Sequence, residues 1–292
     1  MEQSLGARRR RALLAGLAGN WPAAIGLVIL LITLGAALLG PPLLGQQAIK
    51  QSLLLRLQPP IWLGGGRDHL LGTDPLGRDI LARIIVAARV SLTVGLVAVA
   101  VSAVIGGLIG LVAGFYGGLA DRVLMRLADI QLSVPYILLA IAIIAVLGPS
   151  LRNVILALGA GGWPAYARIL RSQAQSIRKL EFVEAAFAIG TRDHHIIWRH
   201  ILPQTLGAFS VLASIGVGQV IITESALSFL GLGVQPPDVT WGTMVGDGRN
   251  YLSTAWWVAT LPGLALMLVI VAINLVSDWL HESFDPLAAR GR

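Results

Sequence analysis

The sequence has 292 residues, of which 55% are hydrophobic and only 13% are charged, and its mean hydropathy is +0.76. Soluble domains carry about 25% charged residues, so this composition excludes a soluble domain and predicts that a membrane surrounds most of the chain. The net charge of +7 comes from basic residues spread between apolar stretches, which argues against nucleic-acid binding, and the absence of cysteine excludes disulfides and cysteine-based metal sites.

The apolar stretches are long and nearly free of charge. They are continuous instead of alternating, which favours helices over a β-barrel. We expect an all-α bundle of six transmembrane helices, a domain over residues 23–280 with spans at about 23–40, 90–114, 131–148, 152–168, 206–230 and 256–278. The third and fourth spans are shorter than the roughly 20 residues a crossing needs, and a Gly148-Pro149-Ser150 turn joins them, so we expect a helical hairpin there.

Basic residues predict how this bundle is oriented. Four arginines, Arg8 to Arg11, precede the first span, and cytoplasmic segments are rich in Lys and Arg. We therefore expect a cytoplasmic N-terminus at 1–22, an outer loop at 41–89, an inner loop at 169–205 and a cytoplasmic tail at 281–292. A cleaved signal peptide is the alternative for the first span, but the apolar run is long and no A-x-A site follows it, which favours a retained helix.

The second half of the outer loop has a helical pattern of its own. Apolar residues from Leu76 onward fall at helical spacing, and charged residues fill the other positions. This pattern predicts an amphipathic helix at the membrane surface before the second span, beginning near Asp74-Pro75.

Three glycines of the second span, Gly106, Gly110 and Gly114, recur at four-residue spacing. Small residues on one face let a second helix approach closely. The sequence therefore predicts a helix-packing face here, although glycine is also common in membrane helices in general.

The inner loop reads as two short helices joined by a bend. Residues 180–189 are good helix formers, and Gly190 follows where a helix would end. Thr191 is placed to cap a second helix, Asp193 lies near its N-terminus, and Pro203 is expected to separate that helix from the fifth span. The bend would let a partner approach the backbone closely, and Glu184 and Arg192 would supply charges for specificity.

Motifs for chemistry on this chain are absent from the sequence. A P-loop needs a lysine within G-x-x-x-x-G-K-[ST], and neither Lys50 nor Lys179 fits that pattern. No G-x-S-x-G or H-E-x-x-H motif occurs, so an intramembrane enzyme is disfavoured. His194 and His195 are adjacent and would point to different sides of a helix, so we expect no metal site.

Glu224 is the only acidic residue within a predicted span apart from Asp278, which is the last residue of the sixth span. A carboxylate at that depth is a candidate pathway residue, for example for the amino group of a peptide, or it is hydrogen-bonded near a helix end. An ion-coupled secondary transporter would also carry such groups, but its expected repeated halves are not visible in the sequence.

The inner-loop segment EAAFAIGTRDHHIIWRHILP at 184–203 resembles a signature of the permease subunits of bacterial ABC importers. The isoleucine position of that signature falls on His200, whereas Leu202 and Pro203 are in place. Three further segments resemble the dipeptide/oligopeptide/nickel branch of this family, specifically its second, C-type permease. They are GTDPLGRDILARI at 72–84, GPSLRNVILALGAGGWPAYARILRSQ at 148–173 and TESALSFLGLGVQPPDVTWGTMV at 223–245. The resemblance therefore covers most of the chain from residue 70 onward.

The resemblance implies a non-catalytic subunit of an ATP-driven importer in the bacterial inner membrane. It would form the solute pathway with a second, homologous permease, receive solute from an extracytoplasmic binding protein, and dock two ATPase subunits, or a homodimer of one, which bind ATP and Mg²⁺. The implied docking residues are Glu184, Ala185, Ala186, Gly190, Arg192, Asp193, Leu202 and Pro203. Di- or oligopeptides are the expected solutes, with nickel chelates, glutathione or opines as alternatives.

Overall fold

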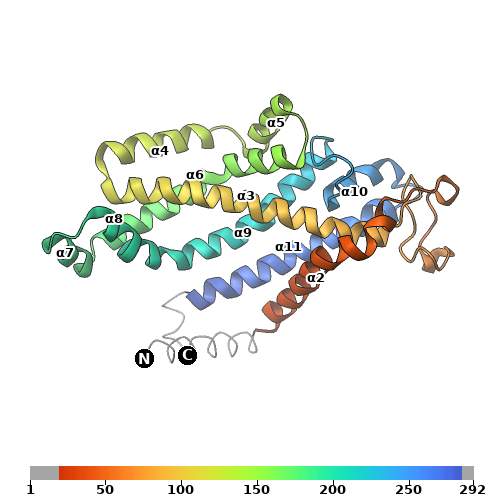
Figure 1. Ribbon diagram of the computed structural model, residues 1–292, viewed down its shortest axis with the longest axis horizontal. Coiled ribbons are helices and arrows are strands. Elements are labelled where there is room, and N and C mark those ends of the chain that lie inside the picture. The colour runs from red at the N-terminus through yellow and green to blue at the C-terminus, as the bar shows by residue number, and fades with distance from the viewer. Residues whose placement is uncertain (1–19, 285–292) are drawn as a thin grey trace. The chain divides into compact units, whose positions relative to one another are not determined.

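The structure is a computed structural model that describes residues 20–284. The expected N-terminal arginines and the end of the C-terminal tail lie outside the described residues. Helices dominate the described part, which contains no β-strand (Figure 1). The longer helices are α2 (Trp21–Ile49), α3 (Ile80–Tyr116), α4 (Gly118–Leu132), α5 (Tyr136–Leu147), α6 (Leu151–Arg178), α9 (Leu202–Phe229) and α11 (Trp257–Phe284). The shorter ones are α7 (Glu181–Ala188), α8 (Asp193–Ile196), the π-helical segment Ile197–Ile201 and α10 (Trp241–Gly248).

Several helices are long and apolar enough to cross a membrane. Within residues 20–284 they are α2, α3, the helix that runs from Asp193 to Phe229, and α11. The pair α4 and α5, bent by 84° between them, meets the same criterion together and would make a fifth. The all-α fold is confirmed, and the number of six crossings stays a prediction.

The first predicted loop is shorter than expected, because the helices on both sides of it are longer. Helix α2 continues to Ile49, past Pro41 and Pro42, since the charge-free sequence extends that far and membrane helices tolerate internal proline. The expected surface helix before span two is instead the first part of α3, and its start near Asp74-Pro75 was wrong. Asp79 fixes the actual start, where its Oδ1 accepts a hydrogen bond from the Ala82 amide at 2.7 Å.

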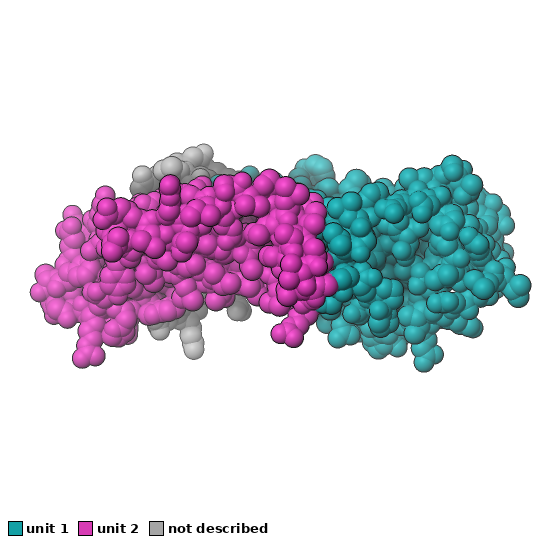
Figure 2. All heavy atoms as spheres, turned by 90° about the horizontal axis from the view of Figure 1, so that it is seen from above, with its two compact units in different colours: residues 1–95, 149–151, 217–292 teal, residues 96–148, 152–216 magenta. Residues whose placement is uncertain are grey.

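The described residues divide into two compact units (Figure 2). Unit 1 comprises residues 20–95, 149–151 and 217–284. In it α2 and α10 both pack against α11. Its core includes Ile80, Ile221 and Trp241, and the Trp241 indole donates a hydrogen bond to the Ile84 carbonyl at 3.0 Å.

Unit 2 comprises residues 96–148 and 152–216. The two acids of α4 that face α6, Asp121 and Asp129, pair with Arg171 and Arg168. A buried apolar cluster in the same unit includes Phe115, Leu170, Ile196 and Ile201. This cluster holds the short helices of the inner loop against α3 and α6.

Candidate functional site

The segment predicted to be the inner loop is a helix–turn–helix, as the sequence predicted. Helix α7 ends at Ala188, and Gly190 takes a left-handed conformation with φ of +77°. The Gly190 amide donates to the Phe187 carbonyl at 2.9 Å, and the Thr191 amide donates to the Ala186 carbonyl at 3.0 Å. These two bonds form a Schellman motif. This motif ends a helix with a residue in the left-handed conformation, which only glycine adopts without strain.

Two local predictions for the second half of the loop were wrong. Thr191 does not cap the next helix, because Arg192 occupies the N-cap position and makes no side-chain capping bond. Pro203 does not separate that helix from the following span, since α8, the π-helical segment and α9 run on as one helix from Asp193 to Phe229. The wider π turn just before Pro203 gives the proline ring room that a regular α-turn would deny it.

The predicted docking residues separate into a buried group and an exposed group. Ala186 is buried in the apolar cluster of unit 2, and Leu202 packs against that cluster. These two therefore hold the loop in place. The remaining six are exposed: Glu184, Ala185, Gly190, Arg192, Asp193 and Pro203.

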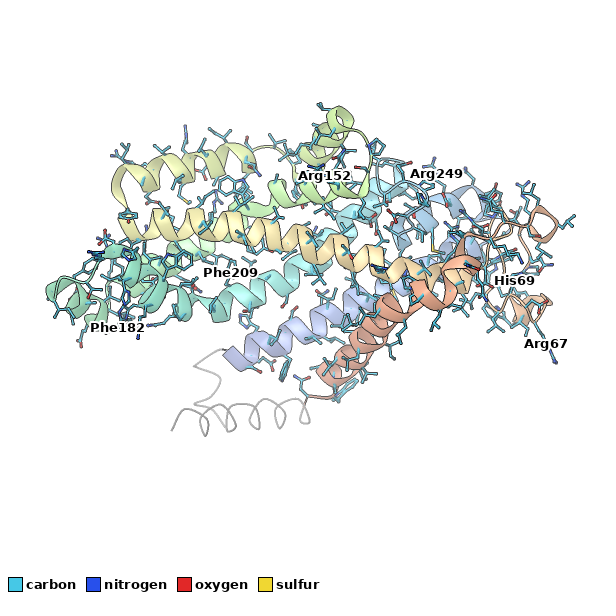
Figure 3. All side chains as sticks on the ribbon, in the orientation of Figure 1. Arg67, His69, Arg152, Phe182, Phe209 and Arg249 are labelled. Carbon is cyan, nitrogen blue, oxygen red and sulfur yellow. The ribbon has the colours of Figure 1, made fainter. Side chains whose placement is uncertain are left out.

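Three exposed apolar side chains lie among these polar residues and escaped the sequence prediction. Phe182, Ile189 and Trp198 are all solvent-exposed, and Ile189 is 82% exposed. Figure 3 shows Phe182 in the region of α7. Large apolar residues within an otherwise polar loop are the signal that would have found them, because a group of such residues on a polar surface is typical of a protein contact. Together with the six exposed residues of the predicted docking set, they form a surface that we name the coupling surface.

A cation–π arrangement ties α7 to the helices behind it. The Arg178 guanidinium, at the end of α6, lies 5.3 Å from the ring centre of Phe115 in α3 and 5.8 Å from that of Phe187 in α7. Beside it a hollow of about 550 Å³ is lined by residues that include Lys179, Glu184 and Phe187. A force on α7 would therefore reach α3 and α6 through packed side chains.

The glycine face of α3 lies directly against the backbone of α6. A Cβ atom built on Gly114 would lie 2.6 Å from the Arg171 carbonyl oxygen. Those built on Gly106 and Gly110 would meet the carbonyl oxygens of Trp163 and Ala167 even more closely. The spacing of four residues is matched on both helices, so each glycine admits one turn of α6.

Glu224 is 1% exposed and lies near the end of α9. Its Oε1 accepts hydrogen bonds from the Ser228 hydroxyl at 2.6 Å and from the Thr240 hydroxyl at 2.9 Å. Thr240 is also the N-cap of α10, where it forms a capping box with Thr243. The structure thus places Glu224 as a hydrogen-bonded anchor between α9 and α10, and its role in the solute pathway stays a prediction.

Glu224→Leu is expected to lower the thermal stability of the protein. Glu224→Gln keeps an acceptor for both hydroxyls and should lower it less. The leucine leaves two buried hydroxyls without their acceptor, at a cost of about 1–3 kcal/mol. Thermal unfolding of the purified protein in detergent measures the difference between the two variants. Equal melting temperatures would show that the carboxylate does not anchor α10.

Sequence comparison places the chain in a family. Residues 106–290 match the family described as "Binding-protein-dependent transport system inner membrane component". The chain belongs to this permease family. It is 40% identical over 267 residues to the dipeptide transport system permease protein DppC of Alkalihalophilus pseudofirmus, which covers 91% of this chain and 86% of that protein. It is 42% identical over 223 residues to the glutathione transport system permease protein GsiD of Pectobacterium atrosepticum, covering 76% and 74%.

The fold has a solved counterpart. A chain of the MetNI methionine ABC transporter aligns with a TM-score of 0.53 and 20% identity, covering 67% of this permease and 93% of that chain. The permease is therefore a multi-pass membrane protein with the ABC-importer fold and is a non-catalytic subunit. Family membership implies ATPase partners and a solute-binding protein.

Proposed function

We propose that the permease forms half of the solute pathway of a peptide importer in the bacterial inner membrane. The other half is a second, homologous permease, and two ATPase subunits, or two copies of one, bind ATP and Mg²⁺. Both termini lie in the cytoplasm, so the coupling surface faces the ATPases. Residues 50–79, between α2 and α3, then face the extracytoplasmic binding protein.

The observation that carries this proposal is the coupling surface. It combines a rigid helix–turn–helix, exposed apolar side chains and charges of both signs, as a surface that docks a partner should. Its support against α3 and α6 gives ATP-driven movement a route into the membrane helices. Mutual motion of two such halves would give alternating access to the solute.

Peptides are the solutes that the relatives favour. Several are named as dipeptide or di/tripeptide permeases, and one is named for glutathione, itself a peptide. Glutathione is therefore the second candidate solute. Nickel chelates and opines remain alternatives from the sequence resemblance alone.

Uptake into proteoliposomes tests the proposal. The complex of this permease with its partner subunits and its binding protein should accumulate labelled alanyl-alanine when ATP is supplied, and should not do so with a non-hydrolysable ATP analogue. Parallel arms with glutathione and with a nickel–histidine chelate identify the solute class. Uptake by this chain alone, driven by an ion gradient, would contradict the proposal.

A further inference from the structure

Unit 1 contains a cavity of about 680 Å³ that the coupling function does not use. Its walls come from the end of α2, from residues 76–83, from the segment between α9 and α10, and from α10. Apolar side chains such as Leu76, Val234 and Val239 line it together with charged ones. Small-molecule sites have volumes of about 300–1,000 Å³ and combine an apolar lining with a few polar groups, so this cavity has the size and lining of a ligand site.

Two arginines in the cavity wall share one buried carboxylate. Asp74 is almost completely buried and accepts a hydrogen bond from Arg78 Nε at 2.6 Å, and it also pairs with Arg83. Its other oxygen accepts from the backbone amides of Leu76 and Arg78, at 2.8 and 3.0 Å. Asp74 therefore compensates only one of the two positive charges. The Arg83 side chain is only 6% exposed, so water compensates the other charge poorly.

The second positive charge is compensated only loosely. The Asp247 carboxylate of α10 lies 3.4 Å from Arg83 Nη2 and 3.8 Å from Arg78 Nη2, and its side chain is 48% exposed. Both distances are long for a charge-assisted hydrogen bond, which usually measures about 2.7–2.9 Å, and the Asp247 carboxylate is half exposed to solvent. An incoming anion can therefore replace Asp247 on the two guanidinium groups at little cost, whereas Asp74 holds them in place.

The other charged residues of the wall are arranged differently. Arg249, which Figure 3 places at the end of α10, donates a hydrogen bond to the Phe229 carbonyl at 3.0 Å and lies 5.4 Å from the centre of the Phe229 ring. Asp238 also lines the cavity, and it makes no ion pair within the described part of the chain. Arg78 and Arg83 are thus the two arginines of the wall that share a weakly held carboxylate partner, Asp247.

We propose that this cavity is a solute subsite in which Arg78 and Arg83 receive the carboxylate of the transported peptide in place of Asp247. The inference rests on the proposed import of peptides and assigns part of their recognition to this permease. In the proposed orientation the cavity lies on the outer side of the membrane, where solute arrives. The apolar wall would accommodate peptide side chains, and displaced Asp247 would turn to solvent.

Two charge-matched variants test the subsite. Asp247→Asn and Asp68→Asn each remove one negative charge from an exposed residue of unit 1, but only Asp247 lies in the cavity wall and competes with the ligand. Binding of alanyl-alanine and of alanyl-alanine amide is measured by calorimetry on the purified complex in nanodiscs, without ATP or binding protein. We expect Asp247→Asn to tighten alanyl-alanine binding about threefold, as a loose ion pair allows, and Asp68→Asn to leave it unchanged.

Alanyl-alanine amide has no carboxylate, so Asp247→Asn should leave its affinity unchanged. Arg78→Gln should weaken the binding of alanyl-alanine. An equal gain in both asparagine variants, an equal gain for the amide, or no dipeptide binding would overturn the subsite. The subsite would also be overturned if Asp247→Asn bound the binding protein more tightly but not the dipeptide. That result would indicate that the two arginines bind an acidic side chain of the binding protein. If the wild-type complex still takes up dipeptide with ATP, any of these results contradicts the subsite alone and not the proposed function. The proposed function itself would be contradicted if the wild-type complex showed no such uptake.

Discussion

Gly190→Glu is expected to abolish ATP-driven uptake while the permease still accumulates in the membrane. Gly190 has φ of +77°, and a side chain in the left-handed conformation costs about 1–2 kcal/mol. Nothing lies within 4 Å of a Cβ built there, so the substitution causes no clash and acts through the turn and its new charge. Because the turn sets the angle between α7 and α8, the coupling surface would lose its shape. Glu184→Lys should have the same effect by reversing a charge on that surface.

A matched control separates docking from backbone strain. Gly148, in the turn between α5 and α6, has φ of +83° and ψ of +154°, which strains a side chain at least as much, and it is equally open but not part of the coupling surface. Gly148→Glu should therefore keep most of the uptake. Uptake and ATPase activity are measured in proteoliposomes, with the amount of inserted permease determined by immunoblot. Normal uptake in both Gly190→Glu and Glu184→Lys would refute the docking assignment, and equal loss in Gly148→Glu would attribute the effect to strain.

Gly110→Leu is expected to prevent stable folding of the permease. A Cβ atom on Gly110 would collide with the Ala167 carbonyl and also lie 3.0 Å from the Leu170 Cβ. Backbone atoms cannot move aside as a flexible side chain can, so the cost should reach or exceed about 3 kcal/mol, the upper part of the range for overpacking. Proteins have only about 5–15 kcal/mol of stability in total, so we expect a large fall in melting temperature or loss of the protein from the membrane.

The control for this substitution is Gly35→Leu in α2. Gly35 is also a glycine of a long apolar helix, but nothing lies within 4 Å of a Cβ built there. The leucine should therefore leave the melting temperature nearly unchanged. Fluorescence-detected gel filtration of heated samples compares the two variants, and equal stability in both would show that α3 and α6 do not depend on this close approach.

The family and the coupling loop were accessible from the sequence because both depend on local properties. Hydropathy indicated an all-α membrane protein, and the position of Gly190 after a run of helix formers identified the bend. The helix ends were less accessible. Pro41, Pro42 and Pro203 look like helix breakers in the sequence, yet α2 continues through the first two and a π turn precedes the third. Membrane helices tolerate internal proline, and the π turn leaves room for the ring of Pro203, so these prolines do not mark helix ends.

The sequence by itself determined the all-α membrane class, the family, and the segment that bends at Gly190, since composition and backbone preference act between near neighbours. Only the tertiary structure decided that Ala186 is buried while Ile189 is exposed, that Glu224 receives the hydroxyl of Thr240, and that Asp247 lies against Arg83. Asp247 and Arg83 are separated by 164 residues in the chain. Which distant residues meet depends on how the helices pack, and no local pattern records that.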